Sequence, residues 1–288
     1  MAITIIQSFM EFKSNLEITG LQVETVSTRQ NNVRNAVKKD FEVLESFLTG
    51  SYSRSTMIAP LNQADIDIFT VLKTEHYRAD GQVYLLDQVK DTLKKTYPNS
   101  PKISRNGQAV TITFTDFTVD VIPAFYRQGG GFLIPNTITS RWISTDPKQH
   151  ITISSEQNNI HNGTLIPVVK MIKCWNKSIN YWFGSFHLEV MAQQIFNGVT
   201  ISDYPSGVRY FFDKGREYVT KKNPDPAGYN ADVGSYINTR EKIDVAVSRF
   251  TTAYYRAIKA EAYARESKIK EAVDEWRKIF ENQFPAFG

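Results

Sequence analysis

Hydrophobic residues recur every three or four positions in two stretches near the start of the chain, residues 3–16 and residues 23–47. This spacing places them on one side of a helix, where they can be buried together. A Thr-Gly pair at 19–20 separates the stretches, and such a pair favours a break in a helix. The pattern therefore predicts two helices, the second of which runs as far as Phe47.

From Gly50 onward, β-branched and aromatic residues alternate with polar ones, which is typical of strands with one buried face. The alternating stretches are residues 65–72, 109–117 and 118–125. One helical pattern, at 84–97, interrupts them, and three consecutive glycines within 127–135 favour a turn between strands. We expect this part of the chain to form a mixed sheet that carries helices.

After residue 147 the strand pattern nearly vanishes and helical periodicity replaces it. The predicted helices span residues 164–178, 185–198, 205–219, 233–260 and 262–282. The candidate N-caps are Ser202 or Asp203 for the third of these and Asn230 or Asp232 for the fourth. The chain thus divides into an α+β half, residues 1–145, and an all-helical half, residues 146–288.

Positive and negative charges nearly balance. Lys and Arg number 34 against 30 Asp and Glu, a net charge of +4, well short of the dense basic surface that binds along a duplex. We therefore expect no stable complex with duplex DNA, whereas a small anionic ligand stays compatible. The single cysteine, Cys174, cannot form an intramolecular disulfide and is expected to be a small core residue. No hydrophobic run approaches the ~20 residues of a membrane span, so we expect a cytoplasmic protein.

Two aspartates lie two positions apart in the strand predicted at 65–72. Residues with this spacing project from the same face of a strand with Cα atoms roughly 6 to 7 Å apart, so Asp65 and Asp67 converge. Alternation in the strand predicted at 118–125 allows Asp120 to face the pair from a neighbouring strand. Asp116 competes for this role, but it lies beside an expected turn and we prefer Asp120.

Carboxylates held this close repel one another unless a cation or a proton neutralises them. Ligands that are all oxygen suit Mg²⁺ or Mn²⁺ rather than zinc, and a third carboxylate is needed to hold two such ions ~3.5 to 4 Å apart for phosphoryl transfer. Upstream, Gly50 permits a close approach of the backbone. Ser51, at an expected helix N-terminus, can offer its hydroxyl and amide groups to a triphosphate.

Gly50, Ser51, Asp65, Asp67 and Asp120 together form a pattern that resembles the polymerase-β-type nucleotidyltransferase superfamily. In the helical half, VVKMIKCWN at 168–176 and GSFHLEVMA at 184–192 resemble the second domain of oligoadenylate synthetases, cyclic GMP-AMP synthase and their bacterial relatives, the CD-NTases. The resemblance implies a nucleotidyltransferase core and a helical domain that completes the nucleotide pocket, arranged as two lobes with a central cleft.

The resemblance also implies roles for individual residues. Asp65, Asp67 and Asp120 become catalytic ligands of two Mg²⁺ or Mn²⁺ ions. The implied nucleotide-binding residues are Gly50, Ser51, Arg54, Lys170, Lys173, Ser185 and Phe186. The two lysines are expected to neutralise phosphates, and the ring of Phe186 offers a face on which a base can stack.

Several of these residues also have ordinary structural interpretations. Lys170 and Lys173 fit the solvated side of an amphipathic helix. Ser185 fits the N-cap of the helix that follows it. Arg54 either meets a phosphate or faces solvent.

For three aromatic residues, base stacking and core packing are competing interpretations. They are Phe186, Tyr229 and Tyr236, and for Tyr229 we favour packing. The neighbouring His187 is expected to be a partly buried histidine with no catalytic role.

The resemblance implies an enzyme that condenses ATP or other nucleoside triphosphates into a cyclic di- or trinucleotide second messenger in bacterial antiphage (CBASS) signalling. An effector protein would sense the product, and a regulatory protein could bind the C-terminal QFPAFG. The chain lacks the cysteine-rich zinc insertion of the animal DNA sensor, so we expect no direct activation by double-stranded DNA. The low net charge agrees with this expectation. Two alternatives stay open: a nucleotidyltransferase that modifies a protein or small molecule, and an inert nucleotide-binding module.

Overall fold

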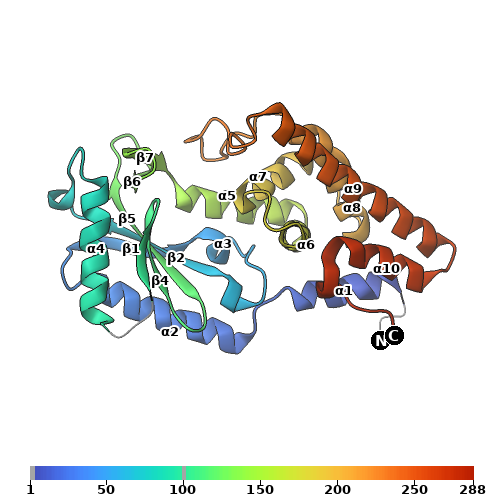
Figure 1. The fold of residues 1–288 in the computed structure, drawn as a ribbon, viewed down its shortest axis with the longest axis horizontal. Coiled ribbons are helices and arrows are strands. Elements are labelled where there is room, and N and C mark those ends of the chain that lie inside the picture. The colour runs from blue at the N-terminus through green and yellow to red at the C-terminus, as the bar shows by residue number, and fades with distance from the viewer. Residues whose placement is uncertain (1–3, 99–101) are drawn as a thin grey trace. The chain divides into compact units, whose positions relative to one another are not determined.

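A computed structural model describes residues 4–98 and 102–288 of the chain (Figure 1). The chain forms two compact units, one of residues 18–151 and one of residues 152–288 together with the segment that ends at Glu17. The first unit is a mixed sheet with helices and the second is helical. The expected start of the first helix at residue 3 lies outside the described residues.

The sheet unit contains seven strands, three α-helices that lie wholly within it and two 3₁₀ turns in the described range. In chain order they are α2 (Gly20–Val37), β1 (Val43–Thr49), α3 (Gly50–Ser53), the 3₁₀ turn Leu61–Gln63, β2 (Asp65–Leu72), the 3₁₀ turn Thr74–His76, α4 (Gln82–Thr96), β3 (Ile103–Asn106), β4 (Ala109–Thr113), β5 (Thr118–Tyr126), β6 (Phe132–Asn136) and β7 (Arg141–Thr145). The strand order is β1-β2-β5-β4-β3, and β6 pairs with β5 and β7. Only β2 and β5 run parallel among these pairs.

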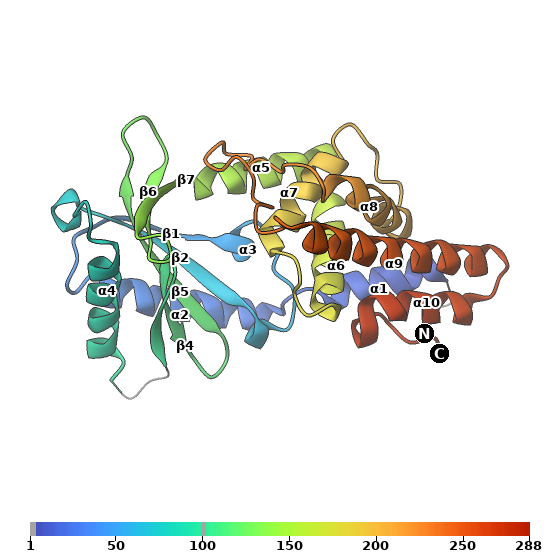
Figure 2. The ribbon, with the colours of Figure 1, turned by 45° about the horizontal axis from the view of Figure 1, so that its top comes forward.

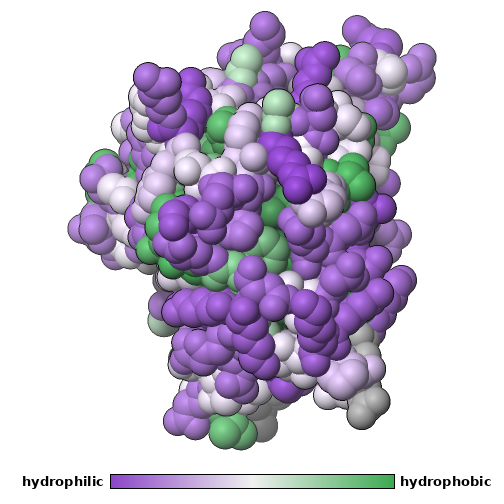
Figure 3. All heavy atoms as spheres, turned by 90° about the vertical axis from the view of Figure 1, so that its left-hand side faces the viewer, coloured by the Kyte–Doolittle hydropathy of each residue, from purple (hydrophilic) through white to green (hydrophobic). Residues whose placement is uncertain are grey.

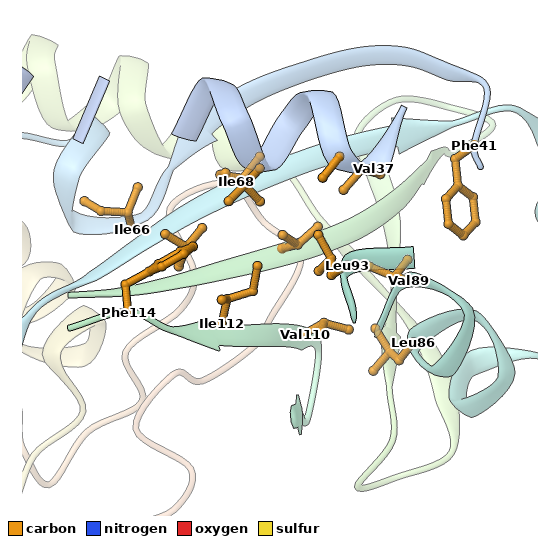
Figure 4. Packing of buried hydrophobic residues seen from close by; sticks show 14 of the residues in the cluster. Val37, Phe41, Ile66, Ile68, Leu86, Val89, Leu93, Val110, Ile112 and Phe114 are labelled. Carbon is orange, nitrogen blue, oxygen red and sulfur yellow. The ribbon is translucent and has the colours of Figure 1, made fainter. Parts of the chain in front are cut away.

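One face of the sheet carries the main hydrophobic core of this unit. Ile66 and Ile68 of β2 project from this face, as do Val110 and Ile112 of β4. Figure 4 shows them pointing toward α2 and α4, from which residues such as Val89 project. The alternation of strands 65–72 and 118–125 therefore buries every second residue against two helices. The residues between them, the aspartates included, lie on the other face.

That other face changes character along the strands. Toward the ends of β2 and β5 it is apolar, and Phe69, Val71 and Ala124 pack there with Phe132 and Ile134 of β6. Toward the starts of the same two strands it is polar. The polar part is the end of the sheet where α3 lies against β1 and β2.

The second unit is built from helices. They are α1 (Ile5–Asn15), α5 (Pro147–Ile160), whose sequence crosses the boundary at 151, α6 (Leu165–Ser178), α7 (Ser185–Ile195), α8 (Tyr204–Tyr218), α9 (Arg240–Arg265), α10 (Ile269–Phe280) and the 3₁₀ turn Glu281–Gln283. The long α9 packs against both α8 and α10 (Figure 2).

The N-terminal helix α1 packs with the second unit, whereas we expected it in the first half of the chain. Phe9 of α1 makes edge contacts with Trp276 and Phe284, at centroid distances of 4.8 and 5.0 Å. This aromatic cluster joins the two ends of the chain. It places Phe284 of the C-terminal QFPAFG in the core, where that side chain is fully buried.

Other boundaries also differ from the sequence prediction. Residues 43–49 form β1, although Leu44 and Leu48 continue a helical spacing, because hydrogen bonds to β2 favour the extended chain. Helix α5 was not predicted, since PKQHITISSEQNNI has no clear apolar period. Helix α9 starts after the N-cap Thr239 rather than Asn230 or Asp232. The cap predicted at Asp203 is confirmed, because its side chain accepts the amide of Ser206.

The surface seen from the α4 side of the sheet unit is mostly hydrophilic (Figure 3). Hydrophobic residues show there only in small areas between polar ones, which fits an α4 whose apolar residues face the sheet. No helix in the described part of the chain is both long and apolar enough to span a membrane.

Candidate active site

The three aspartates lie together on the polar face of the sheet. Strands β2 and β5 are parallel neighbours, and their register places Asp67 directly opposite Asp120. Asp65, two residues before Asp67, lies opposite Thr118 on the same face. Directly paired residues on adjacent strands have side chains about 5 Å apart. Folding thus brings Asp120 beside a pair that is more than fifty positions earlier in the sequence.

Threonines on the neighbouring strands hold two of these carboxylates. The hydroxyl of Thr118 donates to Oδ1 of Asp65, and the hydroxyl of Thr111 on β4 donates to Oδ1 of Asp120. Sequence reasoning missed both threonines. Alternation places Thr118 on the same face as the aspartates, so the sequence indicated that Thr118 lies at the site. The partner of Thr111 depends on the β4–β5 register, which the sequence does not reveal.

Gly50 lies against the carboxylate of Asp67. It begins α3 with φ +67°, in the left-handed region that favours glycine. A Cβ added there would lie 1.7 Å from Oδ2 of Asp67, so a side chain at this position would displace either the carboxylate or the start of α3. The close approach that Gly50 allows is therefore an approach to Asp67.

The short helix α3 begins at Gly50, and the expected start of a helix at this point is confirmed. The backbone carbonyl of Ser51 accepts the amides of Thr56 and Met57, at 2.9 and 3.1 Å. The backbone amide of Arg54 donates to the carbonyl of Gly50. These bonds close a compact turn over the polar end of the sheet. The predicted contacts of Ser51 and Arg54 with phosphates stay predictions.

Burial raises the pKa of the Asp120 carboxyl above its ordinary value. The hydrogen bond from Thr111 opposes this shift, and the negative charge of Asp65 adds to it. A half-buried carboxylate beside another acid gains from a nearby cation. The electrostatics of the site therefore favour a bound positive charge.

The donor set fits Mg²⁺ or Mn²⁺, because it consists of carboxylate and hydroxyl oxygens. Gly50 has no side chain that could cover Oδ2 of Asp67. Within residues 4–98 and 102–288, however, no three Asp, Glu, His or Cys side chains are already gathered as a metal cluster. Two of the aspartates each accept a threonine hydroxyl at Oδ1, which leaves the second oxygen of each carboxylate outside that bond.

Asp116 has a different role from the three site aspartates. Its carboxylate pairs with Arg29 of α2 at 2.8 Å and accepts the amide of Phe117 at 3.1 Å. The guanidinium of Arg29 also lies 4.2 Å from the centre of the Phe114 ring. Asp116 therefore fixes the β4–β5 turn against α2.

The lysines of α6 are buried, so the interpretation that they lie on the solvated side of an amphipathic helix is wrong. Lys170 is 6% exposed and Lys173 is 7% exposed. The ammonium group of Lys170 lies 2.6 Å from a carboxylate oxygen of Glu17, and that of Lys173 lies 3.2 Å from one of Glu189 on α7. Buried charges require such partners. The phosphate-binding role expected for both lysines stays a prediction, and within the helical unit they tie α6 to its neighbours.

The start of α7 is held at several points. Ser185 is its first residue and is exposed, whereas the N-cap is Gly184, so the N-cap interpretation of Ser185 is wrong. Phe186 follows and is half-buried. His187 is buried more fully than the partly buried histidine that we expected, and its Nδ1 lies 2.9 Å from the hydroxyl of Tyr236.

The burial of His187 predicts acid sensitivity of the fold. Burial lowers the pKa of His187 from 6.5 to about 4, and the charge of Asp232 opposes the shift. Because the folded-state pKa is the lower one, this stabilising contribution is complete above about pH 6.5 and is lost as the pH falls toward 4. We expect this group alone to lower the free energy of unfolding by about 2 kcal/mol between pH 7 and pH 5.

Urea unfolding at both pH values measures this effect in the wild type and in His187→Gln. The variant is expected to lose about 2 kcal/mol less over the same interval. An identical pH dependence in the two proteins would contradict the assignment, whatever the absolute stability of the variant.

Comparison with known proteins identifies the family. Residues 3–158, more than half of the chain, match the Second Messenger Oligonucleotide or Dinucleotide Synthetase (SMODS) domain. The chain belongs to this family. The SMODS match covers the sheet unit and with it all three site aspartates.

Similar proteins agree with this assignment over nearly the whole chain. The cyclic AMP-AMP-AMP synthase of Acinetobacter sp. (strain ATCC 27244 / 9458) is 26% identical, over 97% of this chain and 85% of that protein. The cyclic AMP-AMP-AMP synthase of Escherichia coli (strain MS 115-1) is 25% identical, over 85% and 84%. A structure of E. coli MS115-1 CdnC with ATP has a TM-score of 0.79 at 19% identity, over 99% of this chain and 100% of that one. CdnC has also been solved in a complex with HORMA-deltaN, with a TM-score of 0.78 at 19% identity, over 98% of each chain.

The comparisons confirm three predictions: the CD-NTase resemblance, the nucleotidyltransferase fold and the class of enzyme, a cyclic nucleotide synthase. The individual site residues and the role of a central cleft stay predictions. Within the sheet unit, the structure brings Gly50, Asp65, Asp67 and Asp120 to one place. Lys170, Lys173, Ser185 and Phe186 lie in the helical unit.

Proposed function

We propose that this SMODS enzyme condenses nucleoside triphosphates, ATP among them, into a cyclic oligonucleotide. The observation that carries the proposal is the row of aspartates on β2 and β5, with Gly50 against Asp67, inside the matched SMODS domain. A binding module has no need for three acids on one face, so the inert alternative is disfavoured. The full-length similarity to cyclic nucleotide synthases favours ring formation over transfer to a protein or small molecule.

In this proposal Asp65, Asp67 and Asp120 hold two Mg²⁺ or Mn²⁺ ions. When bound, the ions supply Lewis-acid stabilisation at the α-phosphate and the leaving pyrophosphate. Asp120 is our candidate acceptor for the proton of the attacking ribose hydroxyl. In each transfer the hydroxyl oxygen bonds to an α-phosphorus as the bond to pyrophosphate breaks. The last transfer, within one linear molecule, closes the ring.

We propose an all-adenine cyclic trinucleotide as the product. The support is that the Acinetobacter and E. coli relatives are both cyclic AMP-AMP-AMP synthases. Cyclic AMP-AMP-GMP is the second candidate, because a synthase of that product from Enterobacter hormaechei is 30% identical over 59% of this chain and 61% of that protein.

We place the reaction in the cytoplasm, in antiphage signalling, with an effector protein that senses the product. The complex of CdnC with HORMA-deltaN supports a regulatory protein partner for this chain as well. Within QFPAFG, Phe284 and Pro285 are buried and residues 286–288 are exposed, so a partner that binds this segment would contact residues 286–288.

Incubation of the purified protein with Mg²⁺ or Mn²⁺ and labelled ATP, alone and with GTP, tests the proposal. We expect a phosphatase-resistant product whose mass is that of a cyclic trinucleotide. ATP alone is expected to suffice for cyclic AMP-AMP-AMP, whereas a requirement for GTP would indicate cyclic AMP-AMP-GMP. Label that appears on the protein or on a small acceptor, or no turnover with either metal, would refute the synthase.

A further inference from the structure

The first turn of α7 is fixed from two sides within the helical unit. From α6, the buried side chain of Asn176 donates to the carbonyl of Phe183 at 2.8 Å and accepts its amide at 2.9 Å. From the loop between α8 and α9, the hydroxyl of Tyr236 accepts the amide of Gly184 at 2.8 Å. Gly184 is the N-cap of α7 and directly precedes Ser185. The second of these contacts depends on a single hydroxyl group.

The same hydroxyl bonds to His187, and the chemistry of the backbone amide sets the direction of the bond to Gly184. The amide of Gly184 can only donate, so the oxygen of Tyr236 accepts from it. We assign the proton of Tyr236 to Nδ1 of His187, which lies 2.9 Å away. A ring that accepts at Nδ1 carries its own proton on Nε2. Tyr236 thus links the N-cap of α7 to a neutral His187, one turn into the helix.

The loop is shaped to reach this position. Gly234 lies so close to the His187 ring that a Cβ there would lie 2.8 Å from Nε2. Asp232 holds the loop conformation by accepting the amides of Asn223 and Gly234, at 3.0 and 2.9 Å. Nε2 of His187 is buried and has no hydrogen-bond partner among the described residues. The ring is therefore oriented mainly through Nδ1 and Tyr236.

We propose that Tyr236 is a positioning residue for nucleotide binding, because its hydroxyl fixes the turn of α7 that carries Ser185 and Phe186. The inference rests on one part of the proposed function, the binding of ATP, and on the nucleotide contacts that the sequence predicts for those two residues. It assigns the Tyr236 hydroxyl to the α7 turn, in place of the base-stacking role that the sequence left open for this residue. Without the hydroxyl, the Gly184 amide and the His187 ring both lose their partner, and the first turn of α7 becomes free to shift.

The variant Tyr236→Phe removes this hydroxyl and keeps the ring. We expect the dissociation constant of a non-hydrolysable ATP analogue, measured by calorimetry with Mg²⁺, to rise about fivefold to tenfold, the factor to which one hydrogen bond corresponds. At saturating ATP, kcat is expected to stay within about twofold, since this interaction acts on binding. The matched control is Tyr255→Phe on α9, an exposed tyrosine, and it is expected to change neither value.

A combination with Phe186→Leu separates positioning from a general structural role. We expect Phe186→Leu to weaken binding of the analogue, and Tyr236→Phe to add little in that background, because both changes remove the same contact. Independent, additive effects would overturn the proposal, as would a Tyr236→Phe protein that melts at a lower temperature but binds the analogue normally. A wild type that binds the analogue without making a cyclic product would refute the proposed function while leaving this inference standing.

The tautomer of His187 gives a readout that is independent of the nucleotide. Nitrogen-15 spectra of the histidine rings, with His187 assigned from the signal that His187→Gln removes, are expected to show the proton on Nε2 in the wild type. In Tyr236→Phe the signal is expected to shift, because Nδ1 loses its donor. A proton on Nδ1 in the wild type would contradict the hydrogen-bond direction and overturn the proposal.

Discussion

The Asp120→Asn variant is expected to lose product formation by about a thousandfold or more while its fold becomes more stable. Asp120 lies opposite Asp67 on the neighbouring strand, and in our proposal it both binds an ion and accepts the proton of the ribose hydroxyl. Asparagine has the same shape but neither the charge nor the basicity. Removing a group that acts only in the transition state costs on the order of 10²- to 10³-fold, and this residue has two such roles.

The gain in stability follows from the direction of the pKa shift. Burial raises the pKa of Asp120 above its ordinary value, so the charged form is less well stabilised in the folded protein than in the unfolded chain. A folded-state pKa above the unfolded value means that this group's contribution to stability is present below about pH 4 and is lost as the pH rises. At pH 7 the wild type bears the cost of the buried charge and Asp120→Asn does not. Urea unfolding in metal-free buffer should therefore show a higher midpoint for the variant.

Asp116→Asn is the matched control for this experiment. Asp116 precedes the same strand, but it pairs with Arg29 and caps a turn. Its variant is expected to keep activity and to lose stability, the opposite of Asp120→Asn. If Asp120→Asn kept activity within tenfold of the wild type, Asp120 would not belong to the catalytic site.

The core of the sheet unit was predictable because local pattern and tertiary packing agree there. Alternation in residues 65–72 and 118–125 correctly assigns Ile66 and Ile68 to the core and the aspartates to the opposite face. Alternation does not reveal which strands are neighbours. The pairing of Asp120 with Asp67 was therefore a hypothesis that only the parallel β2–β5 register could bear out.

The errors arose where a distant partner decides the structure. Residues 43–49 have a helical spacing of leucines, yet they pair with β2, and strand pairing outweighs the weak local preference. By sequence alone, Lys170 and Lys173 also fit a solvated helix face. The sequence pattern does not reveal their partners, because Glu17 is far away along the chain and Glu189 lies on another helix. The same reason hid the role of Tyr236, whose contacts are about fifty positions away.

The Gly50→Ala variant is expected to lose activity by about a hundredfold or more, through Asp67. The added Cβ would lie 1.7 Å from Oδ2 of Asp67, far inside van der Waals contact, so either the carboxylate or the start of α3 has to move. Displacement of a catalytic group by about 1 Å costs on the order of a hundredfold. The variant also places a side chain at φ +67°, which costs about 1 to 2 kcal/mol of stability.

Gly198→Ala separates the two effects of this substitution. Gly198 has φ +72°, close to that of Gly50, but nothing lies within 4 Å of an added Cβ. It is expected to lose the same 1 to 2 kcal/mol or so of stability and to make product at the wild-type rate. Activity in Gly50→Ala equal to that in Gly198→Ala would show that Asp67 tolerates displacement and is not a catalytic ligand. If Gly50→Ala loses activity and Gly198→Ala does not, the result would support the proposal that Gly50 leaves room for a catalytic carboxylate of Asp67.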